Sequence, residues 1–203
     1  EWLAQARLNA RAALEADLRQ AVQRNELVLH YQPQEDTQGR CLGVEALVRW
    51  QHPQRGQVQP LDFIPLAEET GLILPIGQWV LCQACSTMAA WEADPRLAGL
   101  GMAVNVSARQ LHQPDFVHNV RVQLRSHGID PALLKLEITE SMLLDNIEQT
   151  VETMQALKAL GVRFSLDDFG TGYSSLNYVK RLPLDQIKID QSFVRDILSD
   201  PND

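Results

Sequence analysis

Short apolar segments alternate with longer amphipathic segments along most of this chain, and this rhythm restricts the folds open to it. The short segments are rich in valine, isoleucine and leucine, as strands are, whereas the longer ones repeat apolar residues at helical spacing. Strands that alternate with helices indicate βαβ units and therefore an α/β fold with a parallel sheet. We expect strands at residues 27–31, 42–50, 102–106, 133–139, 163–167 and 186–190, and helices at 3–24, 63–69, 76–93, 114–127, 146–160, near 174–180 and from 191 onward.

The connection between the first two expected strands differs from the others. Residues 34–40 are short and polar and contain Gly39, which predicts a hairpin and hence an antiparallel first strand. A closed barrel of alternating strands and helices needs eight strands and typically ~250 residues, more than this chain supplies. Two architectures remain open at this point: a TIM-like (β/α) barrel with an antiparallel first strand, incomplete in this chain, and an open doubly wound sheet.

Charge narrows the range of partners. The net charge of −8 argues against a nucleic-acid polymer, because phosphate backbones are bound by basic surfaces. A small phosphate ester is still compatible, since a bound metal ion can invert the local charge. No apolar run in the sequence approaches the ~18–20 residues that span a bilayer, and no signal peptide is recognisable.

The cysteines indicate a reducing compartment and hence a cytoplasmic location. There are three, Cys41, Cys82 and Cys85, and an odd, low count is unusual for disulfide-bonded proteins. Cys82 and Cys85 have CxxC spacing but lie in an apolar helical run, without a second pair or a nearby histidine to complete a zinc site. Burial in the core is therefore favoured over metal or redox chemistry.

Polar residues stand at or near the carboxyl ends of five successive expected strands. In a parallel barrel these ends meet on one face, where the active site lies. Carboxylates gathered there would repel one another unless a cation neutralised them, and oxygen ligands without Cys or His suit Mg²⁺ or Mn²⁺. Adjacent aspartates could bridge two ions ~3.5–4 Å apart, as in many phosphodiester-cleaving enzymes. The residues are Glu45, Asn105, Glu137, the pair Asp167 and Asp168, and Lys188 with Asp190.

Each of these residues also has a simpler explanation. Glu45 lies in an otherwise apolar strand and would need a partner if buried, but Asn105 could merely cap a strand end. Glu137 alternates with apolar neighbours, a pattern that equally fits a solvent-facing residue. Asp167 and Asp168 could form a turn or a helix cap, and Lys188 could lie at a surface edge. The repeated spacing favours a common site.

Six short blocks of residues follow one another along the chain. They are Leu29-His30-Tyr31-Gln32-Pro33, Glu45-Ala46-Leu47 followed by Val48-Arg49-Trp50, Asn105-Val106-Ser107, Glu137-Ile138-Thr139-Glu140, Asp167-Asp168-Phe169-Gly170-Thr171-Gly172-Tyr173-Ser174-Ser175-Leu176, and Lys188-Ile189-Asp190. In this order the blocks resemble the EAL domain family of cyclic di-GMP phosphodiesterases, and the resemblance runs from about residue 10 to the end of the chain.

The resemblance implies a TIM-like barrel with an antiparallel first strand that hydrolyses cyclic di-GMP to linear pGpG, with Mg²⁺ or Mn²⁺ as cofactor and Ca²⁺ as inhibitor. It also implies a role for each matching residue. One metal would be held by Glu45, Asn105, Glu137 and Asp167, and the second by Asp167 and Asp168. The catalytic residues would be Lys188, which orients or activates the attacking water, Asp168, and Glu140, which anchors the Gly170–Gly172 loop. The substrate would be contacted by Gln32, by Arg49 and by Asp190, which lies beside Lys188 in the sequence.

The family pattern continues into two further strand–helix units, with a Glu-Gly-Val-Glu block and a later Gln, that do not follow Asp203. We therefore expect residues 25–203 to form an EAL-type barrel domain whose carboxyl-terminal part is missing, and this chain to turn over substrate poorly or not at all. The unpaired edges could be covered by a homodimer. Residues 1–24 are expected to form a linker helix from an upstream sensor or diguanylate-cyclase-type domain, in a cytoplasmic or membrane-anchored protein, although a helix packed on its own domain fits equally well.

Two other functions fit the same residues. A cyclic di-GMP receptor without catalysis would bind the nucleotide and signal to a neighbouring domain. A protein-interaction scaffold would bind no nucleotide at all. Loss of metal ligands would mark a receptor, and all first-site ligands are present in this sequence.

Overall fold

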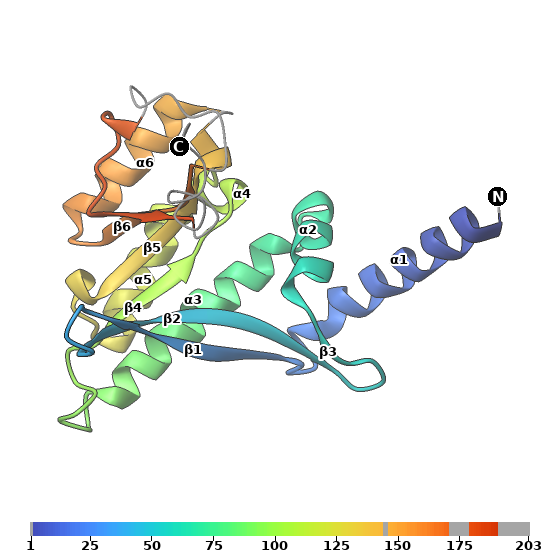
Figure 1. The fold of residues 1–203 in the computed structure, drawn as a ribbon, viewed down its shortest axis with the longest axis horizontal. Coiled ribbons are helices and arrows are strands. Elements are labelled where there is room, and N and C mark those ends of the chain that lie inside the picture. Colours follow the sequence, from blue (N-terminus) through green and yellow to red (C-terminus); the bar gives the residue numbers. More distant parts are fainter. Residues whose placement is uncertain (1, 144–145, 171–178, 191–203) are drawn as a thin grey trace, which may run out of the picture.

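One mixed sheet runs through the computed structural model, which describes residues 2–143, 146–170 and 179–190 (Figure 1). Its strands follow the order β1-β2-β4-β5-β6-β7, and the short β3 pairs with β2. The strand bounds are β1 Leu27–Glu35, β2 Cys41–His52, β3 Gly56–Val58, β4 Gly101–Asn105, β5 Leu134–Thr139, β6 Arg163–Phe169 and β7 Gln186–Ile189.

The sheet confirms the antiparallel start. β1 and β2 form an antiparallel hairpin, whereas β2, β4, β5, β6 and β7 all pair in parallel. Neighbouring strands also follow one another along the chain, the order of a barrel that is wound in one direction. A doubly wound sheet would reverse its strand order at a switch point, so the sequential order excludes that alternative.

Helices connect the parallel strands and pack on the sheet. α3 contacts β4 and α5, and α6 contacts α5 and β6, so the three form a layer along the sheet (Figure 1). The helix bounds are α1 Trp2–Ala21, α2 Pro60–Thr70, α3 Ile73–Trp91, α4 Ala108–Leu111, α5 Phe116–His127 and α6 Ile147–Ala159, with 3₁₀ turns η1 Pro131–Leu133 and η2 Glu140–Leu143.

The central strand β5 is covered on both faces. Leu134, Leu136 and Ile138 belong to the hydrophobic core, with no exposed surface. Successive side chains of a strand point to opposite faces, so Lys135 and Glu137 face the inside of the curled sheet. Glu137 is nevertheless only 1% exposed. The interior of the sheet is therefore a partly buried polar space.

Most expected elements are present, and the differences are local. The structure adds β3, a three-residue strand paired with the end of β2, and the four-residue α4, neither of which has a periodic pattern long enough to predict. The expected helix near 174–180 lies mostly outside the described residues. The expected helix from 191 and the loop residues 171 and 172 lie wholly outside them.

The N-terminal helix α1 meets the domain only with its second half. Its first half extends away from the sheet (Figure 1), whereas Leu18 and Ala21 are buried in the core. Asp17 pairs with His52 at 3.1 Å and lies 3.6 Å from Arg55, which ties the helix to the β2–β3 turn. The predicted division at residue 24 stays a prediction.

Helix α3 is the most apolar helix of the fold. By length and composition it is the one helix in the described residues that could cross a membrane, contrary to the expectation from the sequence that no apolar run approaches that length. One side of it packs in the core, including Ile76, Val80 and Met88, which is typical of a core helix. Cys85 is buried and Cys82 is exposed, and burial raises the pKa of the Cys85 thiol to about 12. This supports the structural explanation of the CxxC spacing.

Candidate metal centre

Strand register brings four of the predicted ligands together. Asn105 is the register partner of Glu137, and Thr139 is the partner of Asp167 on the next strand. Glu45 lies in the first half of the long β2, rather than at its end. Only Gly43–Ala46 of β2 pair in parallel with β4, however, so Glu45 does lie near the end of the parallel part of that strand.

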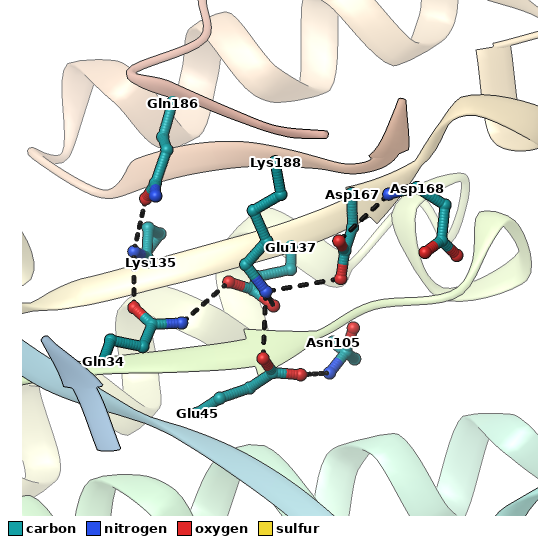
Figure 2. A network of polar contacts seen from close by, with 9 residues as sticks. All are labelled: Gln34, Glu45, Asn105, Lys135, Glu137, Asp167, Asp168, Gln186 and Lys188. Carbon is teal, nitrogen blue, oxygen red and sulfur yellow. Dashed lines mark hydrogen bonds and ion pairs between the residues drawn. The ribbon is translucent and has the colours of Figure 1, made fainter. Parts of the chain in front are cut away.

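Three carboxylates converge from β2, β5 and β6. One oxygen from each of Glu45, Glu137 and Asp167 lies within 4.8 Å of the other two, an arrangement that could hold a metal ion. The side-chain amide of Asn105 donates a hydrogen bond to Oε1 of Glu45 at 2.8 Å. Figure 2 shows these side chains directed toward one another from neighbouring strands.

The ammonium of Lys188 lies among these carboxylates (Figure 2). Its Nζ donates to Glu45 Oε2 at 2.9 Å, to Glu137 Oε2 at 2.5 Å and to Asp167 Oδ2 at 3.3 Å. Burial alone would lower the pKa of Lys188, but the hydrogen bonds that it donates to Glu137 and Glu45 outweigh burial and raise the pKa above its ordinary value. Lys188 is therefore a cation at neutral pH and balances part of the acidic charge.

The two glutamates differ in their pKa. Burial raises the pKa of Glu137, and the charges of Glu45 and Asp167 add to the effect. Burial also disfavours charge on Glu45, but its hydrogen bonds with Lys188 and Asn105 prevail and lower its pKa. Glu45 is thus the more firmly ionised of the two, and Glu137 depends more on a nearby cation.

Both aspartates lie in a bulge of β6. The pairing of β6 with β7 is irregular between Leu166 and Phe169, and Asp168 has a left-handed backbone with φ 55°. Bulges re-aim side chains beside active sites, and here the carboxylate of Asp168 points away from Lys188 (Figure 2). Burial, then the charges of Asp167 and Asp190, raise the pKa of Asp168. Asp168 lies beside the carboxylate group, not within it.

Other predicted residues surround this group. Glu140 is buried in η2, and its Oε2 accepts a hydrogen bond from the backbone N–H of Gly170 at 3.0 Å, at the start of the predicted loop. Asp190 follows β7, close enough to influence Asp168. Gln32 lies opposite Glu45 in the hairpin register.

Arg49 lies on the same face of β2 as Glu45, four residues further along. Its guanidinium donates to the backbone oxygen of Val48 at 2.8 Å. Gln32 is thus close to Glu45, whereas Arg49 lies further along the same face of β2. In the part of the chain that the structure describes, neither side chain hydrogen-bonds to Glu45, Glu137 or Asp167.

Three polar residues inside the sheet have no counterpart in the sequence predictions. Lys135 donates to the side-chain oxygens of Gln34 at 3.0 Å and of Gln186 at 2.7 Å, and Gln34 in turn approaches Glu137 Oε1 at 3.5 Å (Figure 2). The available signal was a lysine two residues before Glu137 in an apolar strand. Because Lys135 and Glu137 are two residues apart in a strand, their side chains lie on the same face of the sheet.

The donor set fits a hard divalent cation. It consists of carboxylate oxygens with an adjacent amide, and it contains no thiol or imidazole among the described residues. Mg²⁺ and Mn²⁺ prefer such oxygen ligands. The excess of acidic groups over the single ammonium of Lys188 is a further reason for a cation to bind.

Comparisons with known proteins agree with this geometry. The sequence profile of the EAL domain family matches residues 15–203. The chain is 48% identical over 188 residues to the bifunctional diguanylate cyclase/cyclic di-GMP phosphodiesterase MucR of Pseudomonas aeruginosa, covering 92% of this chain and 27% of MucR. It is 44% identical over 188 residues to the cyclic di-GMP phosphodiesterase PdeR of Escherichia coli, covering 93% of this chain and 28% of PdeR.

Solved structures share the fold. The PaMucR phosphodiesterase in complex with c-di-GMP superposes with a TM-score of 0.87 at 46% identity, covering 94% of this chain and 77% of that chain. The EAL enzyme Bd1971 bound to cAMP and cyclic di-GMP gives a TM-score of 0.86 at 35% identity, covering 96% and 54%. The chain spans only about a quarter of the curated relatives named above. Because the family profile matches nearly all of its residues and the curled sheet is shared with solved EAL structures, this protein belongs to the EAL domain family.

Proposed function

We propose that this chain is a metal-dependent phosphodiesterase domain that hydrolyses cyclic di-GMP to linear pGpG with Mg²⁺ or Mn²⁺. The observation that carries the proposal is the convergence of Glu45, Glu137 and Asp167 within 4.8 Å at the ends of parallel strands. Relatives named as cyclic di-GMP phosphodiesterases, and a related structure in complex with c-di-GMP, support the choice of substrate.

In this proposal the acidic group binds the metal. Glu45, Glu137 and Asp167 supply carboxylate oxygens, and Asn105 completes the set with its amide. Asp168, next to Asp167, contributes to a second metal site. A bound divalent ion would supply positive charge beside the scissile phosphate and lower the pKa of a water molecule.

The remaining residues act on water and substrate in the same proposal. Lys188 orients the attacking water, and its hydrogen bonds to all three carboxylates support this role. Arg49 can donate two hydrogen bonds to a phosphate, and Gln32 and Asp190 contact the substrate. Glu140 holds the start of the loop through its bond with Gly170 N.

We also propose that the domain works within a larger cytoplasmic or membrane-anchored signalling protein. The relative MucR is bifunctional, which supports a diguanylate-cyclase-type or sensor domain upstream. In this arrangement residues 1–24 form the linker helix and residues 25–203 the EAL-type domain, which could pair as a homodimer.

Turnover of cyclic di-GMP with Mn²⁺ tests the function directly. The reaction is followed by chromatographic separation of pGpG, for residues 1–203 and for a form extended at its carboxyl end. We expect hydrolysis by the extended form and little by residues 1–203, with Ca²⁺ acting as an inhibitor, because Ca²⁺ is larger and accepts looser geometry. Nucleotide binding without hydrolysis in both forms would instead support a receptor.

Substitution of Glu45 tests the metal site. Glu45→Ala in the extended form should abolish metal-dependent turnover, because a carboxylate central to the cluster is lost. Glu35→Ala removes the same charge from an exposed position on the same hairpin and should leave turnover unchanged. Equal rates for Glu45→Ala and the parent would remove Glu45 from the metal site.

A further inference from the structure

A second polar group lies directly beneath the carboxylates, centred on Lys135. Its ammonium is half-buried inside the sheet and is held by two amide oxygens, those of Gln34 at 3.0 Å and Gln186 at 2.7 Å. Within the described residues no carboxylate lies within ion-pairing distance of Lys135. Its hydrogen-bond partners are neutral, and the charges of Glu137 and Glu45 act on it only from a distance, while burial lowers the pKa of its ammonium. A partly buried charge without a direct ion pair is costly, so its position calls for an explanation.

Lys135 determines which way the amide of Gln34 points. An ammonium can only donate hydrogen bonds, so it must face the carbonyl oxygen of the amide. The NH₂ end of Gln34 is then turned toward Glu137, whose Oε1 lies 3.5 Å away. Without Lys135, the amide would be free to present its oxygen to Glu137, and two acceptors would repel each other.

The amide of Gln34 and the ammonium of Lys188 together orient the carboxylate of Glu137, each from one side. Oε1 faces the amide of Gln34, whereas Oε2 is the oxygen that faces Lys188 (Figure 2). Glu137 thereby presents a defined oxygen to the space that it shares with Glu45 and Asp167. Outer partners of this kind commonly orient metal ligands.

The strands provide room for this arrangement. At the level of Lys135, its register partner on β4 is Ala103, which is small and buried. The short side chain of Ala103 on this face leaves space for the long side chain of Lys135 to cross the interior of the sheet.

We propose that Lys135 is a positioning residue that, through Gln34, orients the carboxylate of Glu137 for metal binding. This inference rests on the phosphodiesterase function proposed above. The competing explanation is purely structural. Because Gln34 lies on β1 and Gln186 on β7, Lys135 also joins the two outermost strands of the sheet, and its loss could change stability alone.

Direct Mn²⁺ binding, measured by the electron paramagnetic resonance signal of free Mn²⁺, separates the two explanations. Lys135→Met keeps the length of the side chain but removes the donor, and we expect about 10-fold weaker binding, as for other outer partners of metal ligands. Gln34→Met should have a similar effect. In the double variant the loss should not exceed that of the larger single change, because both act through the same contact with Glu137.

Lys180→Met is the matched control, because it removes the same charge from an exposed position and should bind Mn²⁺ as the parent chain does. Urea unfolding in EDTA gives the stability of each variant. Weakened Mn²⁺ binding in variants that remain folded supports the positioning role. If Lys135→Met does not fold, Gln34→Met alone tests the positioning role, since it breaks the same series of contacts from Lys135 to Glu137.

Three results would overturn the inference. Unchanged Mn²⁺ affinity in folded Lys135→Met or Gln34→Met would leave only the structural role. Strictly additive losses in the double variant would show that the two residues act separately. A parent chain that binds no Mn²⁺ would refute the metal site of the proposed function, and the role of Lys135 with it, so the two failures are distinguishable.

Discussion

At the scale of single residues, Lys188 controls the charge balance of the site. In the described part of the chain, its ammonium is the one cation that forms ion pairs with Glu45, Glu137 and Asp167 together. Without a metal ion, this ammonium offsets the repulsion between Glu45, Glu137 and Asp167. A divalent ion would reduce the repulsion between the carboxylates more strongly. We therefore expect a bound metal to offset the loss of the Lys188 charge.

Substitution of Lys188 by methionine tests this compensation. In EDTA, Lys188→Met should lower the free energy of unfolding by about 2 kcal/mol, less than for a fully buried pair, because the side chain is 21% exposed. Addition of Mn²⁺ should restore more stability to this variant than to the parent, since the ion neutralises the uncompensated carboxylates. Urea unfolding with and without Mn²⁺ measures both effects.

Lys180→Met serves again as the control of equal charge change at an exposed position. The idea fails if Lys188→Met and Lys180→Met unfold alike in EDTA. It also fails if Mn²⁺ stabilises both variants to the same extent.

Glu137 shows what sequence can and cannot predict about a site of this kind. Its alternation with Leu136 and Ile138 fits a solvent-facing residue as well as a ligand, because the pattern records only that two faces differ. In this sheet the polar side chains of β5 face the inside, and Glu137 is only 1% exposed. Lys135 lies on the same face of β5, and its role could not be predicted for the same reason. Alternation shows which residues share a face, but it does not show what that face contacts.

At the scale of elements, the short helix α4 holds the chain that follows Asn105. Ser107 caps this helix, and Gln110 returns the interaction by accepting from the backbone N–H of Ser107 at 3.1 Å. Gln110 is also packed against Gly77 of α3, where an added Cβ would lie 1.8 Å from its Nε2. The close approach of the Gln110 side chain of α4 thus explains a glycine in the first half of the long helix α3.

Gly77→Ala tests this contact. Alanine alone would stabilise a helix by up to ~1 kcal/mol relative to glycine. Overpacking against Gln110 should outweigh that gain and give a net loss of about 1–2 kcal/mol. Thermal or urea unfolding of the purified variant provides the measurement.

The sign of the effect should reverse when Gln110 is shortened. In a Gln110→Ala background the clash is absent, so Gly77→Ala should be neutral or stabilising. An equal loss in both backgrounds would show that Gln110 is not the group that requires glycine at position 77.

The elements that sequence missed share one property. The three-residue β3 and the four-residue α4 are too short to display a period, and both depend on partners elsewhere: β2 for β3, and Gly77 for the residues of α4. The long strands and helices were predictable because each carries its own repeating pattern. The register that aligns Asn105 with Glu137 follows from strand pairing, so the composition of the site was predictable and its distances were not.

At the scale of the whole molecule, Asp185 links the last described strand to the rest of the domain. Its carboxylate accepts from Lys158 of α6 at 2.6 Å and from the backbone N–H of Phe164 in β6 at 2.7 Å. Burial would raise the pKa of Asp185, but these hydrogen bonds outweigh it and lower the pKa. Ionised Asp185 therefore stabilises the folded state.

The sign of the pH dependence follows from this lowered pKa. The contribution of Asp185 should be complete above the unfolded-state pKa of about 3.9 and be lost as the pH falls through the lower folded-state value. Asp185→Asn should therefore cost about 1 kcal/mol near neutral pH, through loss of the charged hydrogen bonds. The difference from the parent should disappear in strong acid, in unfolding curves recorded from pH 7 to pH 2.

Asp115→Asn is a suitable comparison, because Asp115 is exposed and its side chain makes no capping hydrogen bond to α5. It should shift stability little at any pH. A difference between Asp185→Asn and the parent that stayed constant down to pH 2 would contradict the role assigned to the ionised carboxylate.

The reversed direction of β1 has a practical consequence. Because β1 runs against β2 and the strands parallel to it, its turn into β2 lies at the start of the parallel strands, at the end of the sheet opposite the acidic group. Asp36 closes this turn by accepting from the backbone N–H groups of Gln38 and Arg40, and a side chain added at Gly39 would meet nothing within 4 Å. An epitope or a small fluorescent reporter inserted there would project from the far side of the domain, so binding at the metal centre could be followed by a label that does not obstruct it.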